Sequence, residues 1–132
     1  MDGVGSSMRT AGLAIALMGL LLGVAGCSKP KIDAELAAKG EQAASVCSAC
    51  HTFRVGKHLV GPSLANVYGR KAGSAKGYAY SDAMKNSGIT WDEASLTQFI
   101  ADPQGTMPGT NMAIQPIPKE TARAITEYLK TK

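Results

Sequence analysis

Aromatic side chains are scarce in this sequence, and no pattern in it requires a β-strand. They make up 5% of its 132 residues, with one Trp, four Tyr and two Phe. A domain this small with so few large side chains has little with which to fill a core. No run alternates apolar and polar residues over strand length, whereas fifteen Gly and six Pro indicate much loop. We therefore expect a small all-α domain whose long loops wrap around a buried cofactor.

Concentrated charge is lacking as well. The formal net charge is +4, but the Lys and Arg residues are scattered from Lys29 to Lys132 without a dense cluster. Nucleic-acid binding needs a basic patch or stripe, so we expect no nucleic-acid partner. Electrostatic steering toward an acidic partner would be weak.

The cysteines are too few and too unevenly spaced for a disulfide scaffold. There are three, with Cys27 alone and Cys47 and Cys50 only three residues apart. An odd count in this arrangement leaves no sensible set of pairs. We interpret them as one single cysteine plus a functional pair.

The N-terminus has the pattern of an export signal. Residues 13–25 read LAIALMGLLLGVA, an apolar run as long as a signal-peptide core and short for a membrane-spanning helix. A start at Met8 would leave Arg9 as the one charged residue before this run, which makes a better signal than the longer start, where Asp2 offsets Arg9. We therefore predict a signal peptide over residues 1–26, with Met8 as the possible true start.

The sequence around Cys27 resembles a bacterial lipoprotein cleavage site. Residues 24–27 read VAGC, in which the Cys would become the first mature residue and carry lipid. Two alternatives stay open: an ordinary signal-peptidase cut after Gly26, and an uncleaved helical anchor, which the short apolar run disfavours. Lipid on Cys27 also accounts for the odd cysteine. Residues 27–32 would then be a short lipid-anchored tether before a folded domain over residues 33–132.

Within that domain, capping residues and helical spacing predict a few helices. We expect one over residues 33–46 with Asp33 as its N-cap, a turn or two of helix at 64–68, one from Trp91 capped by Thr90, and one over 119–130. The helix that starts at Trp91 should end before Pro103. Residues 102–118 hold four Pro and two Gly and should form no regular element.

The strongest signal is Cys47-Ser48-Ala49-Cys50-His51. C-x-x-C-H is the attachment pattern for a c-type haem, in which two thiols bond to the vinyl groups and the histidine binds the iron. A thioredoxin-like redox pair would need a parallel sheet, which the sequence does not indicate. Half of a zinc site would need four ligands, and apart from Cys27 only His58 remains.

An electron-carrying haem needs a second axial ligand. The remaining candidates from residue type are the following: His58, Met84, Met107 and Met112. The residues by themselves leave the choice open.

Further motifs resemble the small class I cytochromes c of mitochondria and bacteria. In order they are GP at 61–62, GRKAG at 69–73, GYAYSDAMKNSGITW at 77–91, DP at 102–103 and PGTNM at 108–112. The similarity runs from about residue 35 to residue 129. It implies the small all-α cytochrome c fold, with several short helices and long loops around one covalent haem c.

The resemblance also implies a role for individual residues. Met112 would be the sixth iron ligand, with Met107 as its competitor because Met-Pro ligands also occur among c-type cytochromes. Met84 would be a core side chain, and His58 a structural histidine. Pro62 would accept a hydrogen bond from the proximal imidazole. The haem propionates would accept hydrogen bonds from Arg70, Tyr80 and Trp91. Thr110 would belong to the methionine loop.

Some positions depart from the mitochondrial pattern. Phe99 stands where those proteins have a Tyr, and Met84 where they have an Asn, so a familiar internal hydrogen-bond network is at least partly absent. The lysines that ring the haem edge there are largely replaced by uncharged residues: Val46, Leu59, Gln104, Gly105, Asn111 and Pro118. Partner choice therefore cannot be copied from those proteins.

These observations predict a single-electron carrier and not an enzyme. It would be exported, lipid-anchored at Cys27 on the periplasmic side of a bacterial membrane, and would shuttle electrons between membrane-bound respiratory or photosynthetic complexes. No small-molecule substrate is expected. Two alternatives remain: a haem-containing redox subunit of a larger enzyme, and a peroxidase-like or gas-binding haem protein with an open sixth site.

Overall fold

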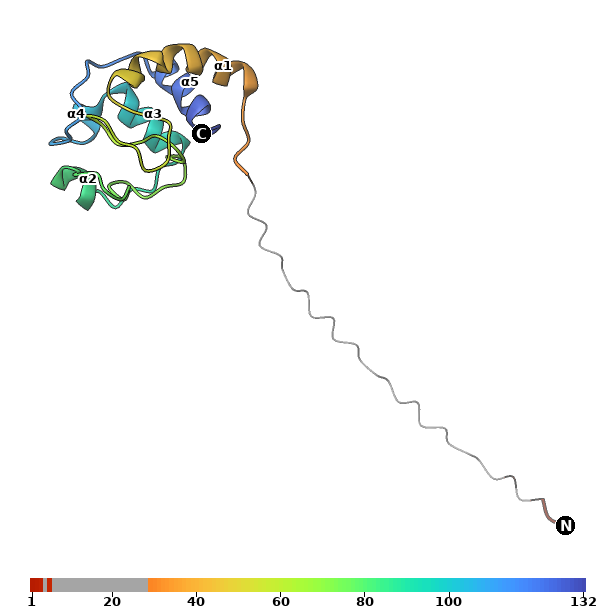
Figure 1. The fold of residues 1–132 in the computed structure, drawn as a ribbon. Coiled ribbons are helices and arrows are strands. Elements are labelled where there is room, and N and C mark those ends of the chain that lie inside the picture. Colours follow the sequence, from red (N-terminus) through yellow and green to blue (C-terminus); the bar gives the residue numbers. More distant parts are fainter. Residues whose placement is uncertain (4, 6–28) are drawn as a thin grey trace.

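The described part of the chain is helical. The computed structural model describes residues 1–3, 5 and 29–132, in which the elements are α1 (Ala34–Ala43), the 3-10 helix η1 (Ala44–Ala49), α2 (Asp82–Asn86), α3 (Glu93–Ala101), α4 (Pro103–Thr106) and α5 (Lys119–Leu129) (Figure 1). Strand-like pairing in these residues is limited to one isolated bridge between Lys71 and Thr90. The all-α prediction is confirmed. The predicted signal segment and Cys27 lie outside the described residues, and none of the described helices is long and apolar enough to cross a membrane.

Helices α1 and α5 cross in close contact, and Gly40 makes this possible. The Asp33 side chain accepts a hydrogen bond from the Leu36 amide, which caps α1 as predicted. Gly40 is buried at the crossing, and a Cβ there would collide with the backbone carbonyl of Ala124 in α5. The backbones of the first and last helices can therefore touch only because residue 40 has no side chain.

The core lies between α1, α3, α5 and the long loops. Helix α3 packs on α5, and a buried hydrogen bond of 3.1 Å joins the Thr97 and Thr126 hydroxyls across this contact. Trp91 and Phe99 pack with ring centroids 5.2 Å apart. The buried apolar cluster includes the following residues: Ala44, Val67, Ala72, Met84, Trp91, Leu96, Phe99, Ile100, Met107, Ala122, Ile125 and Leu129.

Two predicted helix boundaries were wrong in detail. Helix α1 ends at Ala43, and the expected continuation to residue 46 is the 3-10 helix η1, which contains Cys47. Helix α3 begins at Glu93, because Asp92 and not Thr90 caps it. The Asp92 carboxylate accepts from the Ser95 amide at 2.8 Å while the Ser95 hydroxyl accepts from the Asp92 amide at 3.0 Å. This reciprocal capping box fixes the start two residues after the predicted start at Trp91.

Three short segments also differ from expectation. The predicted helical turn at residues 64–68 is irregular, and Asn66 adopts a φ of +53°, which a right-handed helix does not permit. Helix α2, capped by Ser81, was not predicted. Helix α4 is a single turn inside the Pro-rich stretch where no element was expected; Pro103 starts it and the Asp102 carboxylate accepts from the Gly105 amide.

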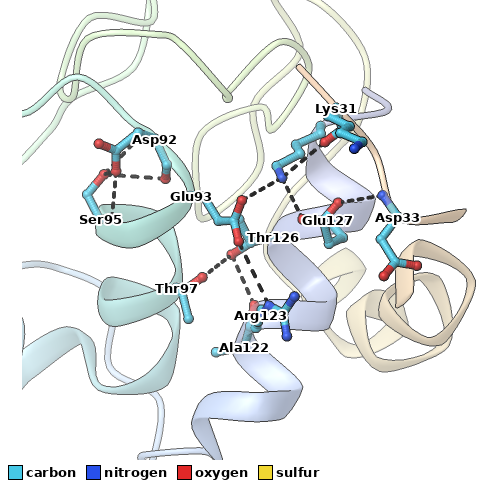
Figure 2. Close-up of polar contacts among 11 residues, drawn as sticks. Lys31, Asp33, Asp92, Glu93, Ser95, Thr97, Ala122, Arg123, Thr126 and Glu127 are labelled. Carbon is cyan, nitrogen blue, oxygen red and sulfur yellow. Dashed lines mark hydrogen bonds and ion pairs between the residues drawn. The ribbon is translucent and has the colours of Figure 1, made fainter. Parts of the chain in front are cut away.

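A charged contact holds the start of α1 to the end of α5, and we call it the N-terminal latch. It consists of Lys130 and Glu127 of α5's end, Glu93 of α3, and the backbone of Lys31 and Asp33 (Figure 2). The Glu127 carboxylate accepts from the Asp33 amide at 3.1 Å and pairs with the Lys130 ammonium. That ammonium also reaches Glu93 at 2.8 Å. The chain before α1 is thus bonded to the C-terminal helix.

The latch contains a buried charge pair, unlike the exposed Glu35–Lys39 pair on α1. The side chains of Lys130 and Glu127 are each 4% exposed. Burial by itself would lower the pKa of Lys130, but its hydrogen bonds to Glu127 and Glu93 outweigh this and raise the pKa above its usual value. The ammonium therefore stays charged at neutral pH. Removing one member of such a pair leaves the other buried without its partner, which is costly.

We predict that Lys130→Ala lowers the free energy of unfolding by about 3 kcal/mol, because it leaves the Glu127 carboxylate buried with only the Asp33 amide as a partner. Denaturant unfolding of the mature protein measures this loss. The double variant Glu127→Leu with Lys130→Met should recover most of it, since an apolar pair leaves no buried charge.

The matched control is Lys39→Ala, which removes an exposed pair with Glu35 whose side chains are 66% and 83% exposed. That change should cost less than about 1 kcal/mol. Equal losses for the two single variants would contradict a stabilising role for the latch.

Candidate haem-binding site

The C-x-x-C-H residues form one tight turn directly after α1. Cys47 lies in η1, and the amides of Cys50 and His51 both donate to the carbonyl oxygen of Cys47, at 3.0 and 2.9 Å. Neither Cys47 nor Cys50 is in a disulfide. Cys50 is exposed, whereas Cys47 is half-buried, and burial raises the pKa of its thiol. Both cysteines therefore lie beside the histidine without a disulfide between them.

The His51 ring is held in one orientation by the Pro62 carbonyl. The Nδ1 atom lies 2.7 Å from the Pro62 oxygen. A carbonyl oxygen can only accept, so Nδ1 carries the proton and donates. This leaves the lone pair of Nε2 free to bind a metal, with the ring direction set by its second partner. The contact is the one that the resemblance implied for Pro62.

Gly61 provides the room for this ring. A Cβ at residue 61 would lie 2.6 Å from Nδ1 and 2.8 Å from Nε2 of His51, and nearer still to Cε1. The Gly61 amide donates to the Cys50 carbonyl at 2.7 Å, so the 59–62 segment is bonded directly to the cysteine turn. Only glycine can occupy this position without displacing the imidazole.

His58 has a structural role. Its Nδ1 accepts from the Ser63 amide at 3.0 Å, which requires that Nε2 carry the proton donated to the Lys76 carbonyl at 2.9 Å. Both ring nitrogens are therefore used in joining two loops. A ligand role for His58 has no free lone pair to support it.

The two other interpretations of the cysteine pair find no support. In the described part of the chain, no three residues of the metal-ligating types His, Cys, Asp and Glu come together as a zinc site would need. A thioredoxin-like pair sits beside a parallel sheet, and between residues 29 and 132 there is none.

Met112 lies on a loop that is fastened by hydrogen bonds. The Thr110 hydroxyl accepts from the Met112 amide at 3.4 Å, and the Gln104 side chain donates to the carbonyls of Thr110 at 2.9 Å and of Met112 at 3.2 Å. Met112 is half-buried and packs against the core cluster, as Cys47 does. The irregular segment is thus ordered by its own polar side chains.

The competing methionines lie in the core. Met107 is 6% exposed and Met84 is 8% exposed, and both belong to the buried apolar cluster. Met107 follows the single turn of α4, and its amide donates back to the Pro103 carbonyl at 2.8 Å. The core role expected for Met84 agrees with this burial.

The residues predicted to contact propionates fall into two groups. Arg70 and Trp91 are joined, because the Trp91 amide donates to the Arg70 carbonyl at 2.9 Å. The Arg70 guanidinium donates to the carbonyls of Ala65 at 2.9 Å and Ser63 at 3.0 Å. Tyr80 packs edge-on against Tyr78 at 4.7 Å between centroids and also borders the core cluster. Their contact with a propionate stays a prediction.

These residues fit a covalent haem. Two free thiols three residues apart stand next to an imidazole whose Nδ1 is engaged and whose Nε2 is free, and a half-buried thioether lies on a loop packed on the same core. Imidazole and thioether are the donor pair of electron-carrying c-type haems. Apolar side chains of the core would pack on the macrocycle, which supplies the large apolar body that the sparse aromatics lack.

Sequence reasoning missed two contributors to this site. Gly61 was part of a quoted motif, but its approach to the His51 ring depends on a fold contact ten residues away in the chain. Gln104 was noted only as an uncharged position, whereas its amide fastens the Met112 loop. No sequence signal beyond the motif itself points to either contact.

Comparisons with known proteins agree on one family. The family model described as Cytochrome c matches residues 37–132. Cytochrome c2 iso-2 of Magnetospirillum molischianum is 48% identical over 88 residues, which are 66% of this chain and 91% of the relative. Cytochrome c2 of Rhodoblastus acidophilus is 51% identical, with 64% of this chain and 79% of the relative covered. The solved structure of cytochrome cH from Methylobacterium extorquens is 50% identical, with a TM-score of 0.67 over 73% of this chain and 98% of that chain.

We predict that Gly61→Ala perturbs iron ligation through His51, because the new methyl group occupies the space of the imidazole. The reduction potential and the optical spectrum of the haem-loaded protein should both change. Gly69→Ala is the control: a Cβ there meets nothing within 4 Å, although its φ of +78° makes it strained. That variant should lose about 1 kcal/mol of stability and keep both properties. Unchanged properties in Gly61→Ala would contradict the assigned ring position.

Proposed function

Since this chain belongs to the cytochrome c family, we propose that it works on the periplasmic side of a bacterial membrane, with lipid on Cys27 as its anchor. As a member of that family it is a single-electron carrier with one covalently bound haem c, and not an enzyme. The observation that carries the site assignment is the C-x-x-C-H turn with Nδ1 of His51 fixed by the Pro62 carbonyl.

Cys47 and Cys50 are the attachment residues. Each thiol would form one carbon–sulfur bond to a haem vinyl group, with its hydrogen going to the other vinyl carbon, so no oxidant would be required. The two cysteines in one turn, neither in a disulfide, support this assignment. Two such bonds hold a cofactor in a chain whose own side chains make only a small core.

His51 and Met112 would bind the haem iron. The free Nε2 of His51 supports the first, and the half-buried place of Met112 on a fastened loop supports the second. Met107 is the weaker candidate because its side chain is already buried in the apolar cluster. When bound, the haem supplies the one-electron couple of its iron, and imidazole with thioether favours the reduced state.

The surrounding residues keep these ligands in place. Pro62 orients the imidazole, while Thr110 and Gln104 restrain the loop that carries Met112. Arg70, Tyr80 and Trp91 would donate to the propionates, because a buried charge requires hydrogen-bonding partners. A ligand set held on both sides moves little when an electron arrives or leaves, which suits a carrier.

The partners are membrane redox complexes, one a donor and the other an acceptor. Several acyl chains on Cys27 would give stable anchoring. A tether confines diffusion to the membrane plane and raises the effective concentration near such complexes. The named relatives are cytochromes c2 and cH, which favours a mobile carrier over a fixed subunit of one enzyme or a haem with an open sixth site.

We predict that Met112→Ala removes the methionine-to-iron charge-transfer band from the optical spectrum of the oxidised protein, whereas Met107→Ala retains it and loses about 3 kcal/mol of stability as a core truncation. Both variants are made with a cytochrome c maturation system, and their spectra are compared with that of the unchanged protein. The opposite pattern would make Met107 the ligand.

We also predict that the protein incorporates a labelled fatty acid and sediments with membranes, and that Cys27→Ser abolishes the labelling. The haem spectrum is the control and should be unaffected, because the anchor lies outside the domain. Release of the unchanged protein into the periplasm without label would favour ordinary signal cleavage.

A further inference from the structure

Exposed apolar side chains surround the cysteine turn. Val46, directly before Cys47, is 75% exposed, and Leu59 and Val60 are 53% and 79% exposed. Hydrogen bonds place the latter two beside Cys50: the Leu59 amide donates to the Gly61 carbonyl at 3.0 Å, and the Gly61 amide donates to the Cys50 carbonyl at 2.7 Å. We call Val46, Leu59 and Val60 the apolar rim.

Three segments that meet in this part of the molecule carry no charge. Residues 42–53, 58–69 and 103–118 contain no Asp, Glu, Lys or Arg. The first holds Cys47, Cys50 and His51, the second holds Pro62, and the third holds Met112. All 24 formal charges of the chain, 14 basic and 10 acidic, therefore lie in other segments.

The apolar rim lies at the opposite end of α1 from the N-terminal latch. Val46 follows the helix, whereas Lys31 and Asp33 precede it. Ten helical residues separate the two ends by about 15 Å. Figure 1 shows residues 29–33, directly before α1, on the side away from α4 and its neighbouring loop. These residues would therefore not collide with a protein seated on the rim.

We propose that the apolar rim is the docking surface for an electron-transfer partner whose own contact surface is apolar and uncharged. This rests on the proposed function, because it takes the haem to lie between His51 and Met112. A charged partner surface would lose its hydration against the rim and find no counter-charge there. An apolar surface gains about 25 cal/mol for each Å² removed from water.

A membrane tether would make an uncharged surface sufficient for efficient docking. Long-range charge attraction raises the rate of encounter between freely diffusing proteins. A carrier confined to the membrane meets its partners at high effective concentration without that attraction. Short-range apolar contact then determines the orientation of docking, and a weak, uncharged interface also permits rapid release.

The test measures electron transfer from the reduced, haem-loaded chain to membrane vesicles of the bacterium that encodes it, at rising salt. The unchanged protein should show a second-order rate that varies less than about twofold between low and physiological ionic strength, because no charges pair at the contact. Leu59→Lys and Val60→Lys should each lower this rate about tenfold or more, since a lysine would be desolvated at the interface.

The matched control is Val55→Lys. Val55 is 77% exposed and Val60 79%, but Val55 lies between the charged Arg54 and Lys57, outside the three uncharged segments. This variant should keep the rate within about twofold of the unchanged protein. Equal losses for Val60→Lys and Val55→Lys, or a tenfold fall in the unchanged protein's rate with salt, would overturn the proposal.

Two other occupants are tested in parallel. Sedimentation of the purified protein in mild detergent shows whether a second copy binds. The Cys27→Ser variant, which has no lipid anchor, is floated with phosphatidylcholine vesicles to show whether a lipid surface binds. Association in either assay that Val60→Lys abolishes, with electron-transfer rates unchanged, would overturn the proposal.

Haem content and reduction potential are measured for each variant first. A protein without covalent haem would refute the proposed function itself, whereas intact haem with unexpected rates would refute the docking surface alone.

Discussion

The hydrogen bond between the His51 imidazole and the Pro62 carbonyl is the contact on which the rest of the site depends. It fixes which ring nitrogen is free, and it joins the cysteine turn after α1 to a loop that is otherwise irregular. The absence of a side chain at Gly61 makes the contact possible, because a methyl group would occupy the ring's position. A metal ligand needs this kind of second partner if its direction is to stay the same in both oxidation states.

The molecule separates its structural charges from its redox surface. The latch places a buried Lys130–Glu127 pair where the first and last helices meet, and it bonds the chain before α1 to that junction. The other end of α1 carries the cysteine turn and the apolar rim, in segments without formal charge. In the function that we propose, anchoring and electron exchange would use opposite ends of one helix, so a membrane attachment at one end would leave the other accessible.

Local signals predicted the long elements and the chemistry, and tertiary contacts determined the rest. The Asp33 cap and the helical spacing of residues 119–130 predicted α1 and α5 because both signals lie within one helix. The C-x-x-C-H motif predicted the cysteine turn for the same reason. Helix α2 is too short for periodicity to detect, and Asp92 displaced Thr90 as a cap because Ser95 completes a capping box. The contact of Gly61 with His51 joins residues that only the fold brings together. The contacts of Lys130 with Glu127 and Glu93 join residues that their spacing does not single out.

Mass spectrometry of the chain produced with a cytochrome c maturation system tests the covalent attachment of haem most directly. The intact mass should exceed that of the polypeptide by one haem, and the tryptic peptide covering residues 40–54 should carry the added mass after the protein is unfolded. Replacing Cys47 or Cys50 by Ala should reduce the number of thioether bonds by one. An unmodified peptide with two thiols open to alkylation would contradict the assignment of this turn as the haem attachment site.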